Sequence, residues 1–262
     1  MNKTRFATFM AILFVCMNCG AKVFPSYLIV EDKTVMGFTE DMPKTIVIPK
    51  GITAIAKGAF SNCTSLENVM IENGVNTIGT GAFFGCTSLL SVAIPKSVRT
   101  IEEGAFEGCS LLARVVIPKG VTEISERTFK DCSSLASVTI PESVRKIDSD
   151  AFKGCTFLVN ITIPKNAVTV GDRAFASCVS LKKVTIGNGV RSIGEDAFRD
   201  CASLKNVTIP KSVRNIGKSA FYSIRKIRYT GTKTQWRTIG GDGIKGFNNT
   251  ITIRCSDGEI VL

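Results

Sequence analysis

Ten cysteines are the residues of this 262-residue chain best suited to chemistry, because a thiolate can act as nucleophile, metal ligand or disulfide partner. Seven of them recur every 23 residues: Cys63, Cys86, Cys109, Cys132, Cys155, Cys178 and Cys201. Ligands spaced in this way cannot surround a zinc ion, and the chain has no histidine to complete a metal site or a serine–histidine or cysteine–histidine catalytic pair. We therefore interpret the seven as a ladder of buried thiols, with sporadic bridges between neighbouring repeats as the alternative.

Two further motifs resemble catalytic or phosphate-binding groups. The triplet GKS at 217–219 ends like a phosphate-binding loop, but Ser212 stands where that loop needs its first glycine. Glu102 and Glu103 form a carboxylate pair, but they occupy outward positions of a repeat that shows no sign of a cleft. We therefore expect neither an enzyme nor a cofactor.

The same spacing governs the apolar residues. Eight phenylalanines recur every 23 residues: Phe60, Phe83, Phe106, Phe129, Phe152, Phe175, Phe198 and Phe221. Seven leucines keep the same interval: Leu66, Leu89, Leu112, Leu135, Leu158, Leu181 and Leu204. A repeat of this length predicts a solenoid, in which each unit buries its apolar face only by stacking on its neighbours.

Each repeat predicts two short strands and a turn. The residues before each "IP" alternate between inward apolar and outward positions, which is typical of a strand with one buried face. The proline ends that strand, because it has no N–H for a ladder. The "VxxI" segment that follows predicts a second extended piece, and "GxxAF" predicts a small helix or 3₁₀ turn on the outer side.

The order "IPxxVxxIxxxAFxxCxSLxxV" resembles the BspA-like, or Treponema-type, leucine-rich repeats over roughly residues 26–258. "YLIVEDKTVMGFT" resembles the family's N-terminal hairpin, and "RYTGTKTQWRTI" to "ITIRCSDG" resembles its C-terminal cap. The resemblance implies an α/β leucine-rich-repeat solenoid curved into a horseshoe, with strands on the concave side, short helical turns on the convex side and capped ends. We expect one domain over 22–262, made of a hairpin cap at 22–47, repeats at 48–221 and a C-terminal cap at 222–262.

Residues 1–21 have the pattern of an export signal. Lys3 and Arg5 precede an apolar run at 6–15, and small residues follow it. The run is too short to span a bilayer comfortably, so we expect a protein of the periplasm or cell surface that is not integral to the membrane. A lipid anchor on Cys16 or Cys19 is the alternative to simple cleavage.

The formal net charge of +11 is distributed along rows. One lysine follows the repeated proline in five repeats: Lys50, Lys96, Lys119, Lys165 and Lys211. Such a rim either keeps the solenoid soluble or attracts acidic partners, such as sulfated glycans or acidic proteins. Nucleic acid is not expected as a partner, because the strands carry no pattern of aromatic residues for stacking.

The outward positions of the strands change character along the chain. Early and middle repeats present mainly apolar side chains, and late repeats present threonine and lysine. We predict a ligand-binding concave face made of Met70, Leu90, Ala93, Arg114, Val116, Phe157, Val159, Lys182, Lys183 and Lys205. The alternative is that these side chains are small and lie against the strand surface, or that they contact the N-terminal hairpin.

These observations predict an exported binding protein that recognises a protein or an acidic glycan through this face. The family resemblance implies surface adhesion or attachment to host matrix. The alternative is a structural protein of the envelope that self-associates through the apolar residues.

Overall fold

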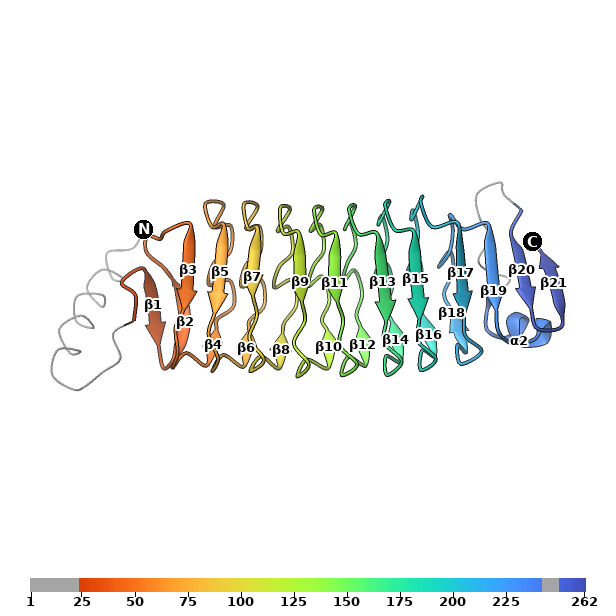
Figure 1. Cartoon of the computed structure of the whole chain (residues 1–262), viewed down its shortest axis with the longest axis horizontal. Helices are drawn as coiled ribbons and strands as arrows, with labels where there is room; N and C mark the ends of the chain where they lie inside the picture. The colour runs from red at the N-terminus through yellow and green to blue at the C-terminus, as the bar shows by residue number, and fades with distance from the viewer. Residues whose placement is uncertain (1–23, 242–249) are drawn as a thin grey trace.

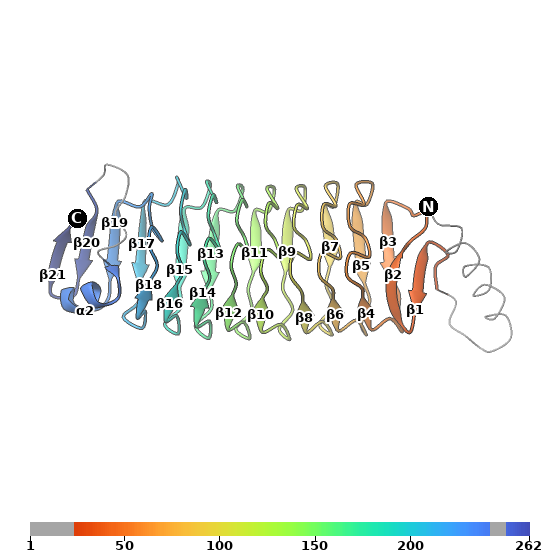
Figure 2. The same ribbon diagram turned by 180° about the vertical axis from the view of Figure 1, so that it is seen from behind.

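The computed structural model describes residues 24–241 and 250–262, so the predicted export signal and its two cysteines lie outside the described residues. The chain forms a stack of coils, each about one repeat long, with β1 and β21 at opposite ends (Figure 1). Figure 2 shows the same row of coils from behind, again nearly straight. The predicted repeat solenoid is confirmed, whereas the predicted horseshoe curvature and concave face are not evident in these views.

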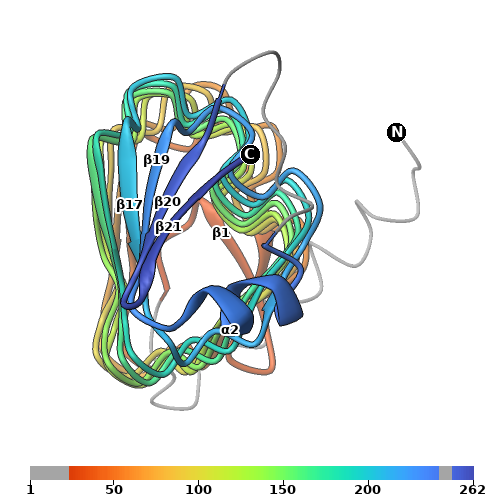
Figure 3. The same ribbon diagram turned by 90° about the vertical axis from the view of Figure 1, so that its right-hand side faces the viewer.

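Two sets of parallel strands run along the stack. The longer strands belong to two sheets, ordered β11-β9-β7-β5-β3 and β13-β15-β17-β19-β20-β21. Their bounds are β3 Thr45–Ile48, β5 Asn68–Ile71, β7 Ser91–Ala93, β9 Arg114–Val116, β11 Ser137–Thr139, β13 Asn160–Ile163, β15 Lys183–Ile186, β17 Asn206–Ile209, β19 Lys226–Tyr229, β20 Thr252–Cys255 and β21 Gly258–Val261. Viewed along the stack, the long strands line one side (Figure 3).

The second set contains the hairpin strands β1 and β2 and the two-residue strands that the "VxxI" segments predict. It is ordered β1-β2-β4-β6-β8 and β10-β12-β14-β16-β18. Their bounds are β1 Leu28–Glu31, β2 Thr34–Phe38, β4 Ala54–Ile55, β6 Thr77–Ile78, β8 Thr100–Ile101, β10 Glu123–Ile124, β12 Lys146–Ile147, β14 Thr169–Val170, β16 Ser192–Ile193 and β18 Asn215–Ile216. An antiparallel hairpin stands at each end of the stack, β1–β2 and β20–β21.

The core is a set of columns that run along the stack. Successive phenylalanine rings are stacked with centroids 5.1–5.6 Å apart, from Phe60 to Phe221. Phe38, on β2, continues the column at 5.8 Å from Phe60. The repeated leucines and cysteines are also buried, so one continuous core serves all the coils.

The predicted helical turns at "GxxAF" are wrong. Between residues 48 and 221 no helix occurs, and hydrogen-bonded turns join each short strand to the next long one. The helix α2, Lys233–Thr238, lies after the repeats. An α/β assignment therefore overstates the helix content, and the repeats are coils of strands and turns.

Helices are prevented by the backbone conformation two positions before and two positions after the repeated phenylalanines. In the repeat of Phe106 these positions are Gly104 and Gly108, with φ of 58° and 74°. Later repeats place Arg127, Asp131 and Ser177 at equivalent positions, also with positive φ. A residue in this left-handed region cannot continue a right-handed helix. Two such residues in each coil from Phe60 to Phe198, and Ser219 in the coil of Phe221, leave only turns.

The turns obtain their remaining hydrogen bonds from neighbouring coils. The N–H of Phe83 donates to the carbonyl oxygen of Ala105 at 2.8 Å, and the N–H of Phe129 donates to that of Ala151 at 2.9 Å. The turn side of the stack is therefore held by a ladder between coils, as the strand sides are. Backbone hydrogen bonds between coils therefore occur on all sides of the stack, which satisfies many of the buried backbone groups.

Candidate binding surface

The outward positions of the long strands form one broad surface, which we call the strand face. Strands such as β13 and β15 alternate between exposed and buried residues, as a strand covering a core must. The parallel register aligns their outward residues into rows. Asn160 lies level with Lys183, and Thr162 lies level with Thr185. The face is therefore a grid whose rungs stand about 4.7–4.9 Å apart.

Some of the predicted binding residues cluster into an apolar zone on the early coils. Met70 lies level with Ala93 and next to half-buried Val47, and Val116 follows in the same row because Arg114 pairs with Ser91. Leu90 lies in a separate outward row, where its N–H donates to the carbonyl oxygen of Glu67 at 2.8 Å. Met70, Leu90 and Val116 expose 54%, 47% and 53% of their surfaces. We define the apolar zone as Val47, Met70, Leu90, Ala93 and Val116.

Three other predicted residues lie on the same side without joining that zone. Arg114 is exposed between Ser91 and Ser137 of the neighbouring strands. Phe157 is 64% exposed just before β13, and Val159 is half-buried. The β11 coil, with its polar Ser137 and Thr139, separates this pair from the apolar zone. The predicted apolar surface is thus two separate patches.

The predicted lysines begin a basic zone on the late coils. Lys182, Lys183 and Lys205 are exposed, and Nζ of Lys205 donates to the carbonyl oxygen of Ala202 at 3.0 Å. The zone extends beyond the sequence prediction, onto β19 and β20. We define the basic zone as Lys182, Lys183, Lys205, Arg225, Lys226, Arg228 and Arg254, all exposed.

The signal for three of the four missed cations, Arg225, Lys226 and Arg228, was present in the sequence. Ile224, Ile227 and Tyr229 replace the repeated leucine, valine and isoleucine, and Ile227 and Tyr229 are buried as those residues are. The residues between them must then face outward, which places Lys226 and Arg228 in the outward rows. Register confirms this, since Lys226 lies level with Asn206 and Arg228 with Thr208.

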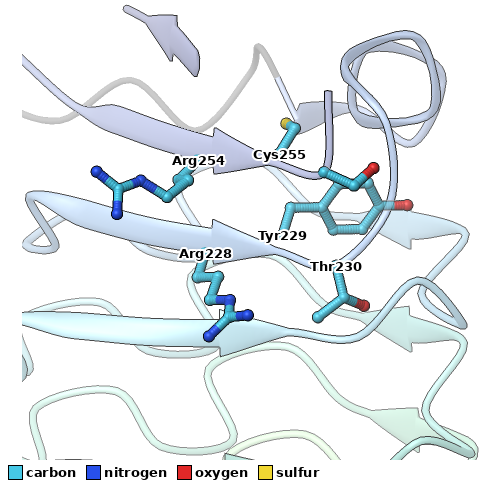
Figure 4. A pocket seen from close by; sticks show the side chains of 6 residues that line it. Arg228, Tyr229, Thr230, Arg254 and Cys255 are labelled. Atoms are coloured by element: carbon cyan, nitrogen blue, oxygen red, sulfur yellow. The ribbon is translucent and has the colours of Figure 1, made fainter. Parts of the chain in front are cut away.

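The end of the basic zone borders a small cavity (Figure 4). Its volume is about 380 Å³, and it is lined by Arg228, Tyr229, Thr230, Arg254, Cys255 and Ser256. Arg228 and Arg254 extend from neighbouring strands on one side, and Tyr229 and Thr230 lie on the other (Figure 4). A second cavity of about 530 Å³ borders the same two arginines and Lys226.

The repeated thiols lie in the core, away from the strand face. In six successive coils the cysteine S–H donates to the carbonyl oxygen of the phenylalanine 26 residues earlier, at 3.1–3.2 Å. Burial raises the pKa of Cys86 and of Cys201 to about 12. The eight described cysteines are unpaired and buried. Such thiols are poor nucleophiles at neutral pH.

Two negative findings apply to residues 24–241 and 250–262. No group of three or more histidine, cysteine, aspartate or glutamate side chains is arranged to hold a metal ion. No helix in those ranges is long and apolar enough to cross a membrane.

The predicted rim of lysines, each of which follows a repeated proline, is exposed at the corners after the long strands.

A family model described as the BspA type leucine-rich repeat region matches residues 37–159 and 146–256, in six copies. The chain belongs to this family. The BspA-type resemblance inferred from the repeat is thereby confirmed. A search of curated proteins finds no match.

Two solved structures show that this BspA-type chain has the leucine-rich-repeat fold. A leucine-rich repeat protein of T. pallidum is 24% identical with a TM-score of 0.63, and the alignment covers 87% of this chain and 99% of that protein. A leucine-rich repeat protein from Bacteroides ovatus is also 24% identical, with a TM-score of 0.61, over 91% of this chain and 67% of that one. At this identity the likeness concerns the fold alone.

Proposed function

We propose that this protein is an exported interaction scaffold that holds a macromolecular partner on its strand face. The observation that carries the proposal is the apolar zone. Three large apolar side chains stand about half exposed on neighbouring coils, although each coil has a full buried core beneath them. Contiguous exposed apolar surface on a folded domain is typical of a contact site.

The fold supports the same function. A repeat scaffold has few places to enclose a small substrate, but it presents a long regular surface to a partner protein. Membership of the BspA-type family favours a protein-interaction role. The basic n-region and apolar run of residues 1–21 support export to the periplasm or cell surface. The family resemblance implies adhesion to host matrix as the specific form of the function.

The test compares two matched charge insertions. Val116→Asp places a carboxylate in the apolar zone, and Thr100→Asp places one on exposed β8 of the other strand set. Each purified variant is immobilised and exposed to solubilised host-matrix proteins. We expect Val116→Asp to lose the bound partner and Thr100→Asp to retain it, because a stranded charge weakens an apolar contact. Equal retention by both variants would remove the apolar zone from the function.

Self-association through the same zone is the second candidate. The regular row of Met70, Ala93 and Val116 would suit a second copy of the same surface. Sedimentation over a range of concentrations distinguishes the two. A dimer that disappears on replacing Leu90 and Val116 by aspartate supports self-assembly, whereas a monomer throughout supports a different partner.

A further inference from the structure

The basic zone places like charges side by side. Arg228 and Arg254 lie level on neighbouring parallel strands, and Lys226 stands two residues before Arg228 on the same face. Like charges opposite one another destabilise a sheet. Among the described residues, Arg254 is the only member of the zone with a carboxylate partner, Glu259 of β21. Both Nε and Nη2 of Arg254 contact Oε1 of Glu259 at 2.9 Å.

The cations are aligned with the axis of the stack. Lys182, Lys205 and Arg225 follow the inward leucine, or its isoleucine replacement, in three successive coils. Arg228 and Arg254 continue a second row, which Thr185 and Thr208 begin. Because neighbouring rungs are about 4.7–4.9 Å apart, the rows present positive charge at regular short intervals. That arrangement is complementary to a linear polymer that carries an anion at each repeat.

The side chains between the cations suit a carbohydrate. Asn206, Thr185 and Thr208 are exposed among the lysines and can exchange hydrogen bonds with sugar hydroxyls. The guanidinium of arginine can bind an oxyanion through two parallel hydrogen bonds. Arg228 and Arg254 both line the two cavities at the end of the zone.

Two other macromolecular classes fit the zone less well. No large apolar side chain is exposed between residues 182 and 241 or from 250 to 256; Val261 is exposed only on the edge strand β21. A protein interface usually has an apolar core around its anchor residues, which these ranges do not supply. Nucleic acid would need an exposed aromatic platform. In the same ranges Tyr229 and Trp236 are buried, and the ring of half-buried Tyr222 lies in a turn under the guanidinium of Arg199.

We propose that the basic zone binds a linear sulfated polysaccharide that lies along the stack axis, with Arg228 and Arg254 holding one sulfate group. This inference rests on the proposed function in that the strand face is the binding surface. It adds a second class of ligand and a separate set of residues. Glu259 competes with the sulfate for Arg254.

The first experiment measures binding of the purified chain to a short heparin oligosaccharide at fixed low salt. Lys226→Glu with Arg228→Glu should weaken binding by about 10-fold or more and flatten its salt dependence. Lys96→Glu with Lys119→Glu makes the same change in net charge at the rim of distant coils and should alter binding less than about 2-fold. Equal losses in both pairs would overturn the proposal.

The second experiment uses a gain of affinity, which a misfolded variant cannot imitate. Glu259→Gln removes the competing carboxylate and should tighten oligosaccharide binding by about 2- to 5-fold. No gain, or a loss, would overturn the role of Arg254. The same chain should bind chemically desulfated oligosaccharide, polyglutamate and single-stranded DNA at least about 10-fold more weakly. Equal binding to polyglutamate or to DNA would assign the zone to an acidic protein or to nucleic acid instead.

A further variant separates this inference from the proposed function. Val116→Asp lies in the apolar zone and should leave oligosaccharide binding unchanged. Loss of matrix-protein capture with intact oligosaccharide binding would support both proposals. Oligosaccharide binding that Val116→Asp abolishes would contradict the separate basic zone.

Discussion

The S–H of Cys132 donates to the carbonyl oxygen of Phe106, in the preceding coil, at 3.1 Å. The same oxygen accepts the backbone N–H of Cys109 at 3.2 Å. One carbonyl therefore closes its own turn and ties the next coil to it. Because the relationship recurs in six successive coils, the repeated cysteine acts as a small buried donor as well as a space-filling side chain.

The phenylalanine column should dominate stability. Phe129 is fully buried between Phe106 and Phe152, at centroid distances of 5.6 and 5.4 Å. Phe129→Ala should lower the free energy of unfolding by about 3–5 kcal/mol, because it leaves a cavity in mid-stack. Phe84→Ala is the control, since Phe84 is 40% exposed on the turn side. Urea unfolding measures both, and equal losses would contradict the assignment of the column as core.

The buried thiols should make the fold sensitive to alkali. Burial raises the pKa of Cys86 and Cys201 from 9.0 to about 12 in the folded chain. Above pH 9 the unfolded chain therefore loses thiol protons that the folded chain keeps, and stability falls as pH rises. Between pH 8 and pH 10 each thiol should contribute a loss of about 1.4 kcal/mol.

A variant with alanine at both positions provides the control. Cys86→Ala with Cys201→Ala should be less stable at pH 8, but its further loss between pH 8 and pH 10 should be smaller than that of the parent by about 3 kcal/mol. Urea midpoints at the two pH values give the comparison. An identical loss in parent and variant would show that these thiols ionise equally easily in the folded and unfolded chains.

Positive φ at the turns predicts where glycine should stabilise the protein. Ser177 has φ of 59° at a position that Gly85, Gly108 and Gly154 fill in other coils. Ser177→Gly should raise the free energy of unfolding by about 0.5–1 kcal/mol, because the left-handed conformation is costly for a residue with a Cβ. Ser180→Gly, at a position without positive φ, should instead lower it by about 0.5–1 kcal/mol. A similar loss in both would refute this explanation of the turns.

The sequence predicted the stacking well because its period is uninterrupted. The positions of Phe129, Leu135 and Cys132 are buried as the repeat requires. Their spacing alone specifies which side chains meet, since each coil packs on the same positions of the next.

The helical turns were predicted wrongly because the left-handed positions are not always glycine. Gly104 and Gly108 flank Phe106, but Arg127 and Asp131 flank Phe129 in the same conformation. The amino-acid sequence of the "GxxAF" segments was therefore compatible with a helix. Comparing the two positions across all copies, where glycine alternates with aspartate, asparagine, serine and arginine, would have revealed the turns.

The binding surface was predicted only in part, and the reason differs from that for the turns. Outward residues are under no packing constraint, so only the register places them. Lys182, Lys183 and Lys205 could be assigned because their repeats are regular. Arg228 and Arg254 lie where the last coil is shortened and the terminal hairpin joins the sheet, so their place beside one another required the structure.

Photo-cross-linking from the strand face tests the central claim most directly. A benzophenone side chain replaces Val116 in one variant and Thr100 in the other, so that each reports on one set of strands. After irradiation with solubilised matrix proteins, we predict a discrete adduct from position 116 and none from position 100. An adduct from position 100 alone, or equal adducts from both, would contradict a binding role specific to the strand face.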